Sequence, residues 1–297
     1  MRRDSSVSGS GVSDSPLVRG DYAAAETEQV RSACLSVAVA LGSMLDEICI
    51  VGGLVPLLLV DQSAFDPEDA HIGTNDLDVG LAMTLLDEAR YAEIATQLRQ
   101  EQFEPDVNAS GNPTNQRWRM HGRKVTIDFL IEPPDENARP ATIKHLQADL
   151  GAYVVPGVAL AFEERVWAPL DGLTLRGERA RRKIPVCGPG AFVVLKALAF
   201  GNRARPKDAY DLLYLLRNWT GRREDVVARL RTQAARHATL VREALRQLER
   251  DFATLDSIGP SRAAEFSGGS DRDADLADAH GEVDDLLAAC RAEGICE

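Results

Sequence analysis

The sequence predicts an α+β protein in which a lobe with a mixed sheet is followed by a mostly helical lobe. Short runs rich in β-branched and apolar residues, typical of strands, lie in the first half, at 48–51, 76–81 and 125–131. Amphipathic patterns typical of helices dominate from residue 188 onward. With 297 residues, 44% of them hydrophobic, the chain is long enough to bury a full core.

The first lobe is expected to alternate helices and strands. Helices are predicted at 22–45, 54–60 and 87–102, and strands at 48–51, 76–81, 103–107, 116–120 and 124–131. His121-Gly122-Arg123 between the last two strands indicates a hairpin. Polar loops are expected at 61–73 and 109–115.

The second half is expected to turn from short strands to helices. Strand candidates are 154–155, 158–162, 166–167 and 183–186, and helices are predicted at 191–200, 207–217, 222–236 and 239–252. After Asp256, one short helix at 283–290 is expected.

These patterns divide the chain into five segments. They are a disordered N-terminus (1–20), an α+β lobe (21–135), connecting strands and loops (136–187), a helical lobe (188–255) and an acidic tail (256–297).

Composition excludes several classes of protein. The chain has no run of about 18 apolar residues, so no membrane span is expected, and the polar N-terminus does not have the pattern of a secretory signal. The five cysteines are scattered without metal-ligand spacing, which favours a reducing cytoplasmic location.

The net charge of −12 is unevenly distributed. Residues 251–297 hold twelve acidic residues and three arginines, whereas residues 176–207 hold nine basic residues and one glutamate. The basic segment suits an RNA backbone, and a solvated loop would also account for part of it.

Asp76 and Asp78 lie two residues apart in a largely apolar stretch that predicts a strand. Residues i and i+2 of a strand point to the same face, which places two carboxylates side by side. Like charges this close repel unless a cation lies between them. We interpret the pair as a site for Mg²⁺, with Mn²⁺ as the alternative. An exposed polar strand face is the competing interpretation.

Two further features fit a phosphate-handling site. Gly52 and Gly53 separate a predicted strand from a helix, a layout in which backbone N–H groups can face a phosphate, although a structural turn would also account for them. Asp128 is the one acid in the apolar run 125–131. Because an unpaired buried carboxylate is costly, we predict that Asp128 is a third metal ligand; a hydrogen-bonded core group is the alternative.

The order of these features resembles the DNA-polymerase-β-type nucleotidyltransferase superfamily. The second half resembles the AbiEii/AbiGii toxin family, which includes the Men-type tRNA nucleotidyltransferase toxins, through Lys196 and the segment Lys207-Asp208-Ala209-Tyr210-Asp211-Leu212. The resemblance covers about residues 30–250 and is patchy between 135 and 185. Gly-Gly replaces the Gly-Ser of many polymerase-β relatives, and Asp128 has no strong counterpart across the toxin family.

The resemblance implies a polymerase-β-like lobe and a role for each matching residue. Asp76 and Asp78 would hold the metal and activate the acceptor hydroxyl. Lys196 would bind the NTP triphosphate, Asp211 would be essential and orient Lys196 or another basic group, and Thr74 would offer its hydroxyl to a phosphate.

Basic residues beside these positions can also meet phosphates. We assign Arg203 and Lys207 to NTP binding, with Arg205 near them. Purely structural roles are the alternative: Lys196 could extend from an apolar helix to solvent, and the Lys207 segment could be an ordinary helix-surface set of ion pairs. The five histidines show no ligand spacing and are interpreted as surface or structural residues.

Three functions are therefore weighed. The leading one is an Mg²⁺-dependent transfer of NMP from an NTP to the 3′ end of tRNA, by a toxin with a cognate antitoxin. The second is transfer to a small molecule or a protein side chain. The third is a non-catalytic module of the same fold that binds a nucleotide or a partner.

Overall fold

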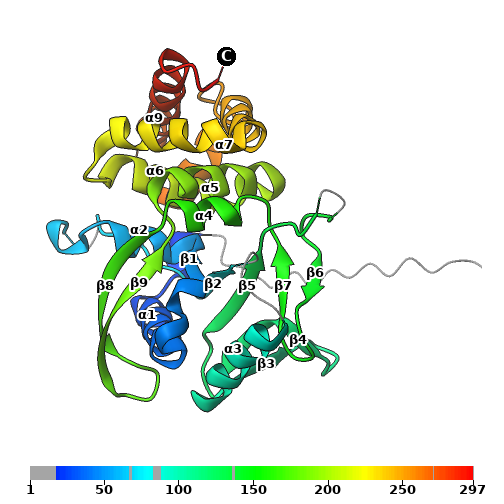
Figure 1. Cartoon of the computed structure of the whole chain (residues 1–297). Coiled ribbons are helices and arrows are strands. Elements are labelled where there is room, and N and C mark those ends of the chain that lie inside the picture. The colour runs from blue at the N-terminus through cyan, green and yellow to red at the C-terminus, as the bar shows by residue number, and fades with distance from the viewer. Residues whose placement is uncertain (1–17, 67–68, 83–87, 136–137, 270, 297) are drawn as a thin grey trace, which may run out of the picture.

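A nine-stranded mixed sheet forms the frame of the first lobe, and a stack of helices forms the second (Figure 1). The computed structural model describes residues 18–66, 69–82, 88–135, 138–269 and 271–296. The main path of the sheet is β3-β4-β5-β2-β1-β9-β8, and β7 pairs with both β5 and β6. The α+β class predicted from the sequence is confirmed.

The bounds of the strands are as follows: β1 Ile48–Val51, β2 Asp76–Leu81, β3 Phe103–Val107, β4 Pro113–Met120, β5 Thr126–Ile131, β6 Ile143–His145, β7 Gly151–Val154, β8 Val166–Leu173 and β9 Arg179–Val186. The helices are α1 Ala24–Leu41, α2 Val55–Leu59, α3 Glu88–Gln100, α4 Val158–Glu163, α5 Pro189–Arg203, α6 Pro206–Asn218, α7 Arg222–Asp251, α8 Ile258–Ser267 and α9 Arg272–Ala292. Short 3-10 turns lie at Arg19–Asp21, Gly42–Glu47, Gly52–Leu54 and Gln62–Ala64.

Strands β1, β2 and β5 form the centre of the sheet. β2 runs antiparallel to β1 and parallel to β5. Ile50, Leu77, Val79 and Ile127 are fully buried, so their burial fixes the register of the three strands. The alternating polar positions of β2 then point to the other face, as the sequence predicts.

Helices cover both faces of the sheet (Figure 1). α1 and α3 pack together on one face, and α1 also contacts β2, β8 and β9. On the other face α4 contacts β1, β5 and α5, so it lies between the sheet and the helical lobe. The helical lobe therefore faces the sheet surface that carries the acidic residues of β2.

The segment 158–162 is helix α4, not the strand expected from its apolar pattern. A short apolar run fits a buried helix as well as a buried strand. The helix is favoured by a contact distant in sequence. Glu132, just after β5, accepts hydrogen bonds from the backbone N–H groups of Gly157 (3.0 Å) and Ala159 (2.7 Å). The carboxylate satisfies donors that a helix N-terminus leaves unpaired.

The acidic C-terminal segment is folded as two helices, α8 and α9, and not as a tail with one short helix. α9 buries Val283, Leu286 and Cys290 and contacts α6, α7 and α8. Its exposed face carries most of the acids, and they dominate the composition. The apolar stripe is therefore easy to overlook in the sequence.

Other elements differ in extent from the prediction. α1 ends at Leu41, because Gly42 takes a left-handed φ of 51°. The predicted break between 236 and 239 is a kink in α7, where His237 leaves helical geometry. The connecting segment supplies β8 and β9, which are longer than expected and extend the sheet through β1. Most of the predicted disordered N-terminus, residues 1–17, lies outside the described residues.

Among the helices of the described ranges, none has the length and apolar character needed to cross a membrane.

We expect Leu286→Ala to destabilise the protein by about 2–5 kcal/mol, since it removes a fully buried side chain of α9 and leaves a cavity. Asp284→Asn, on the exposed face of the same helix, is the matched control, with an expected change within about 0.5 kcal/mol. Urea unfolding measures both. Equal stability of the two variants would mean that α9 is not part of the folded core.

Candidate active site

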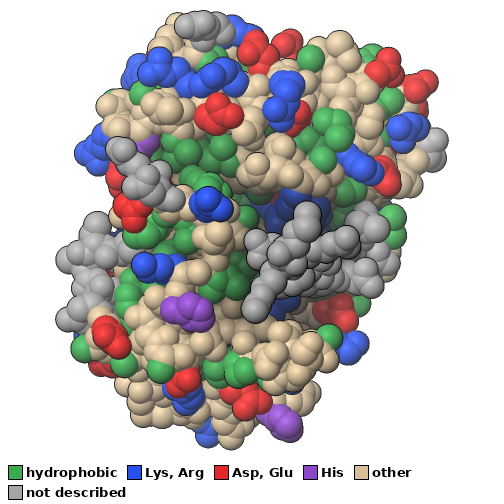
Figure 2. All heavy atoms as spheres, turned by 90° about the vertical axis from the view of Figure 1, so that its right-hand side faces the viewer, with side chains coloured by type: hydrophobic (Ala, Val, Ile, Leu, Met, Phe, Trp, Pro, Cys, Tyr) green, Lys and Arg blue, Asp and Glu red, His purple; other side chains and the backbone are tan. Residues whose placement is uncertain are grey.

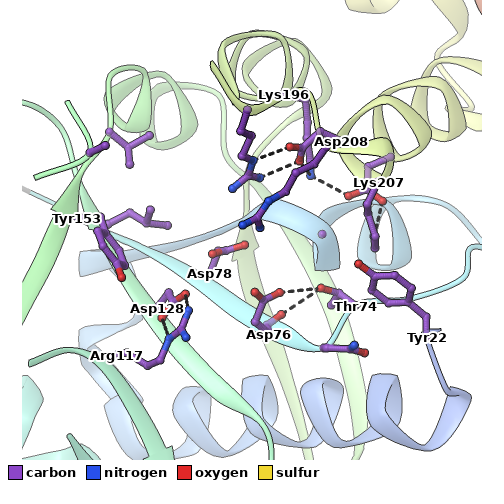
Figure 3. A pocket seen from close by; sticks show the side chains of 18 residues that line it. Tyr22, Thr74, Asp76, Asp78, Arg117, Asp128, Tyr153, Lys196, Lys207 and Asp208 are labelled. Atoms are coloured by element: carbon purple, nitrogen blue, oxygen red, sulfur yellow. Dashed lines mark hydrogen bonds and ion pairs between the residues drawn. The ribbon is translucent and has the colours of Figure 1, made fainter. Parts of the chain in front are cut away.

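The floor of the candidate site is formed by β2 and β5. These strands are parallel, and Asp78 pairs in register with Asp128. Asp76, Asp78 and Asp128 therefore lie on one face of the sheet, as the strand periodicity predicts. Figure 3 shows the three carboxylates between two walls of side chains.

Gly52 and Gly53 lie against this floor. β1 ends opposite Asp78, and a Cβ added at Gly52, which has a φ of 70°, would overlap the Asp78 carboxylate. A Cβ at Gly53 would lie 2.7 Å from the Thr74 hydroxyl oxygen. The two glycines are therefore required by the close approach of the backbone to the acidic face. Thr74 donates a hydrogen bond to Asp76 Oδ1 at 3.1 Å.

A pocket of about 420 Å³ opens above these residues. Its lining includes nine of the ten residues assigned from the sequence, and the tenth, Gly52, lies directly behind Asp78. The lining residues are Tyr22, Gly53, Thr74, Asn75, Asp76, Asp78, Arg117, Asp128, Leu130, Ala141, Tyr153, Val155, Lys196, Arg203, Arg205, Lys207, Asp208 and Asp211. The helical lobe supplies the last six of these.

The helical wall is an ion-pair network. Lys196 Nζ on α5 donates to Asp208 Oδ1 (2.9 Å) and Asp211 Oδ2 (2.7 Å) on α6. Lys207 Nζ donates to Asp211 Oδ1 at 2.5 Å. Arg203 makes a bidentate pair with Asp208. The expected pairing of Asp211 with Lys196 is present, and the alternatives of a solvent-reaching Lys196 and a surface set on α6 are wrong, because all these groups except Arg203 are buried.

Burial and pairing shift the pKa values of this wall in opposite directions. Burial alone would lower the pKa of Lys196, but the carboxylates of Asp211 and Asp208 outweigh it and raise the pKa above the usual value. Burial lowers the pKa of Lys207, against the effect of Asp211. Burial opposes ionisation of Asp208, yet Lys196 and Arg203 lower its pKa to about 2. The wall therefore combines charged amines and carboxylates held in fixed positions.

His71 joins the loop before β2 to this wall. Its Nδ1 accepts from the Gly73 N–H at 3.1 Å, so the Nε2–H donates to Asp211 Oδ1 at 2.9 Å. The next N–H, of Ile72, donates to the Tyr210 hydroxyl at 3.0 Å. The interpretation of His71 as structural is consistent with its full burial, but its link to Asp211 has no signal in the sequence.

Asp76 and Asp78 differ from the other carboxylates of the pocket. Asp128, Asp208 and Asp211 each form a salt bridge with a basic residue. Asp76 and Asp78 form none with any residue in the described ranges. Burial raises the pKa of Asp78 well above the usual value, and the nearby charges of Asp76 and Asp128 raise it further. This uncompensated negative charge is the chemistry that a divalent cation fits.

Asp128 has a different environment from that predicted. Arg117 on β4 donates from Nε to Oδ1 and from Nη2 to Oδ2, both at 2.6 Å. No cluster of three metal-ligating side chains is found in the part of the chain that the structure describes. The ligand role of Asp128 remains a prediction from the sequence.

The basic segment 176–207 is divided between two places. Lys196, Arg203, Arg205 and Lys207 line the pocket, whereas the stretch 179–183 belongs to β9 and lines no part of it. Figure 2 shows Lys and Arg side chains at the hollow between the two lobes. The pocket residues missed by the sequence analysis include Tyr22, Asn75, Arg117 and Tyr153. Their positions depend on strand pairing and on the fold of the N-terminal segment.

The comparison with protein families gives a match over residues 74–285, a range that contains β2 and all the residues of the helical wall. The family is described as "Nucleotidyl transferase AbiEii toxin, Type IV TA system". The chain belongs to this family. The nucleotidyltransferase toxin family suggested by the sequence is thereby confirmed, and the family is one of toxins of type IV toxin–antitoxin systems.

Other comparisons add little to the family match. No curated protein matches the chain. Among solved structures, the crystal structure of JHP933 from Helicobacter pylori is similar over 92% of this chain and 96% of its own, with 12% identity and a TM-score of 0.40. That similarity is too low to transfer a site.

We expect protein stability to fall as the pH drops from 6.5 towards 4. Burial lowers the pKa of His71 from 6.5 to about 4, so the unfolded chain binds a proton in this window that the folded protein does not. The stability that depends on neutral His71 is fully present above pH 6.5. Its loss by pH 4 lowers the free energy of unfolding by about 3 kcal/mol. Lys207 and Lys196 also face the imidazole and oppose its protonation, while Asp211 favours it.

Urea unfolding at pH 7 and pH 5 measures about 2 kcal/mol of this loss, the part that falls between pH 6.5 and pH 5. His71→Gln should flatten the dependence between these pH values, and His145→Gln, at an exposed position of β6, should not. An unchanged pH dependence in His71→Gln would contradict the assignment.

Proposed function

We propose that this protein transfers NMP from an NTP to a hydroxyl at the 3′ end of tRNA and that it acts in this way as a toxin. The observation that carries the proposal is the pocket itself. The unpaired acids Asp76 and Asp78 face a wall of amines and guanidinium groups in one cavity. Acidic residues suit a divalent metal, and the cationic wall suits a triphosphate.

Asp76 and Asp78 fit a bound Mg²⁺ or Mn²⁺, because neither forms a salt bridge with a described residue and because burial and the neighbouring carboxylates raise the pKa of Asp78. Such an ion, when bound, stabilises charge on the phosphate oxygens and lowers the pKa of the attacking hydroxyl. Thr74 holds Asp76 through the hydrogen bond to Oδ1, so one acid of the pair is already oriented. Asp128, the third ligand predicted from the sequence, is already engaged by Arg117.

Lys207, Arg203 and Lys196 are our proposed ligands of the triphosphate. Lys207 lies 3.4 Å from the position of a Cβ at Gly53, so the glycine leaves room for a phosphate beside the amine. Arg203 has a side chain that is 47% exposed, and its guanidinium can bind a phosphate while Asp208 holds it. Lys196 is fixed by two carboxylates, and Asp211 keeps it charged.

The reaction balances with these groups. The acceptor oxygen attacks the α-phosphorus, a new P–O bond forms, and the bond from this phosphorus to the bridging oxygen of the β-phosphate breaks. Pyrophosphate leaves towards the helical wall, whose cations stabilise its charge. The proton of the acceptor hydroxyl passes to the carboxylate pair of β2.

Family membership supports the role as a toxin, and a cognate antitoxin follows as part of the proposal. The assignment of tRNA as the acceptor rests on the resemblance to Men-type toxins and on the basic residues that line the pocket. NTP and tRNA are both cytoplasmic, which is where we place the activity.

We expect label from an α-labelled NTP to appear on tRNA in the presence of Mg²⁺, and expect Asp76→Ala or Asp78→Ala to reduce the rate at least about 1,000-fold, because the metal site is lost. The assay incubates total tRNA with each NTP in turn and separates labelled RNA on a gel. Asp171→Asn, an exposed aspartate on β8 outside the pocket, is the matched control and should retain the full rate.

Label on a small molecule or a protein, with none on RNA, would exclude tRNA as the acceptor. The proposed nucleotidyltransferase activity would still stand. NTP binding without any turnover would favour the non-catalytic alternative. Equal rates in Asp78→Ala and Asp171→Asn would contradict the site.

A further inference from the structure

The pocket has a second wall opposite the helical one. It is formed by β4, β5 and β7, and it presents Arg117, Asp128, Leu130 and Tyr153. In Figure 3, Arg117 and Tyr153 lie on one side of Asp78, while Lys196 and Lys207 lie on the other. The phosphates of the NTP do not account for this second group.

The geometry of phosphoryl transfer indicates what this wall faces. The attacking and leaving oxygens lie roughly in line on opposite sides of the phosphorus. In the proposed reaction the pyrophosphate leaves towards Lys207 and Arg203. The attacking hydroxyl must therefore arrive from the side of Arg117 and Tyr153.

Strand register places the residues of this wall on the face of the sheet that carries Asp78. Arg117 pairs with Asp128 between antiparallel β4 and β5. Tyr153 pairs with Leu130 between parallel β5 and β7, two residues further along β5. A cation, an apolar side chain and an aromatic ring thus follow one another across three strands beside the acidic pair.

Arg117 is held rigidly but keeps a free donor. Asp128 engages Nε and Nη2, and this hydrogen-bonded carboxylate raises the pKa of Arg117. Nη1 bonds to none of the described residues, and the side chain is 24% exposed. A guanidinium fixed in this way suits a phosphate diester oxygen.

Tyr153 supplies a flat surface next to this donor. Its hydroxyl accepts a hydrogen bond from Gln116 Nε2 at 3.3 Å, which holds the ring in place. Leu130 and Val155 line the pocket beside it. Aromatic rings with neighbouring cations are typical of single-stranded nucleic-acid sites, where bases stack on the ring.

We propose that Arg117 and Tyr153 form the subsite for the terminal nucleotide of a single-stranded RNA 3′ end. Arg117 binds its phosphate, and Tyr153 stacks on its base. Asp128 is then a positioning residue for Arg117 and not a metal ligand. This inference rests on the proposed nucleotidyltransferase function and names the part of the pocket that selects the acceptor.

The test compares variants of Arg117 on β4 and Tyr153 on β7 with a matched control on β4. Arg117→Gln and Tyr153→Leu should raise the KM for tRNA roughly 5- to 150-fold and leave the KM for NTP within about twofold, as expected for the loss of one stacked or charged contact. Tyr153→Phe should recover most of the loss in Tyr153→Leu. Arg119→Gln is the control, because Arg119 also lies on β4 and pairs with an aspartate, Asp106, but does not line the pocket.

Asp128 is tested by a binding measurement that does not require turnover. Mn²⁺ titration followed by electron paramagnetic resonance should give the same affinity for Asp128→Asn as for its control Asp106→Asn, and weaker binding for Asp78→Asn. Asp128→Asn should raise the KM for tRNA as Arg117→Gln does. Thermal unfolding identifies any variant that fails to fold, and Tyr153→Leu leaves the ion pair intact.

Three results would overturn the inference. They are loss of Mn²⁺ binding in Asp128→Asn, a rise in the KM for NTP in place of that for tRNA, and equal behaviour of Arg117→Gln and Arg119→Gln. If the unmutated protein transfers no nucleotide, the proposed function fails on its own. Fluorescence anisotropy with a labelled single-stranded oligoribonucleotide then still decides whether Arg117 and Tyr153 bind RNA.

Discussion

The buried carboxylate of Asp211 carries the contacts on which the pocket depends. It accepts hydrogen bonds from Lys196 on α5, from Lys207 on its own helix, and from His71 in the loop that leads into β2. A charge in this position is stable only when it is paired. Its removal would leave the buried amine of Lys207 without its carboxylate partner and Lys196 with Asp208 alone, at a cost of about 3–5 kcal/mol. One side chain therefore fixes the cationic wall and holds it at a set distance from the acidic strand.

Much of the fold and of the site follows from local patterns. The alternation around Asp76 and Asp78 predicts a strand with both acids on one face, and β2 has this form. The glycine pair after β1 is accounted for by the space that Asp78 and Thr74 occupy. Lys196, Asp211 and the segment that begins at Lys207 come from a family resemblance, and Arg203 is assigned as a basic residue beside them. The structure brings all four residues into the pocket. Their roles as ligands remain predictions.

The remaining features depend on contacts between residues far apart in the chain. Arg117 meets Asp128 only because β4 and β5 pair in one particular register, and no local pattern distinguishes it from Arg119. Helix α4 begins where Glu132, 25 residues upstream of Gly157, satisfies its first N–H groups. The apolar face of α9 is hard to recognise in the sequence, because the acidic residues of the opposite face dominate the composition of this segment. None of these features can be read from a periodic pattern in a short stretch of sequence.

The charges of the pocket have a consequence for the arrival of substrate. Its lining holds five aspartates and five basic residues, so the opposing charges largely cancel at a distance. The chain as a whole carries a net charge of −12 and offers little long-range attraction to a polyanion. Capture of the proposed nucleotide substrate would then depend on contacts made after collision, inside the Debye length of about 8 Å at physiological salt. Selection of that substrate would rest on fit and on redistribution of existing ion pairs, and electrostatic steering would contribute little to the association rate.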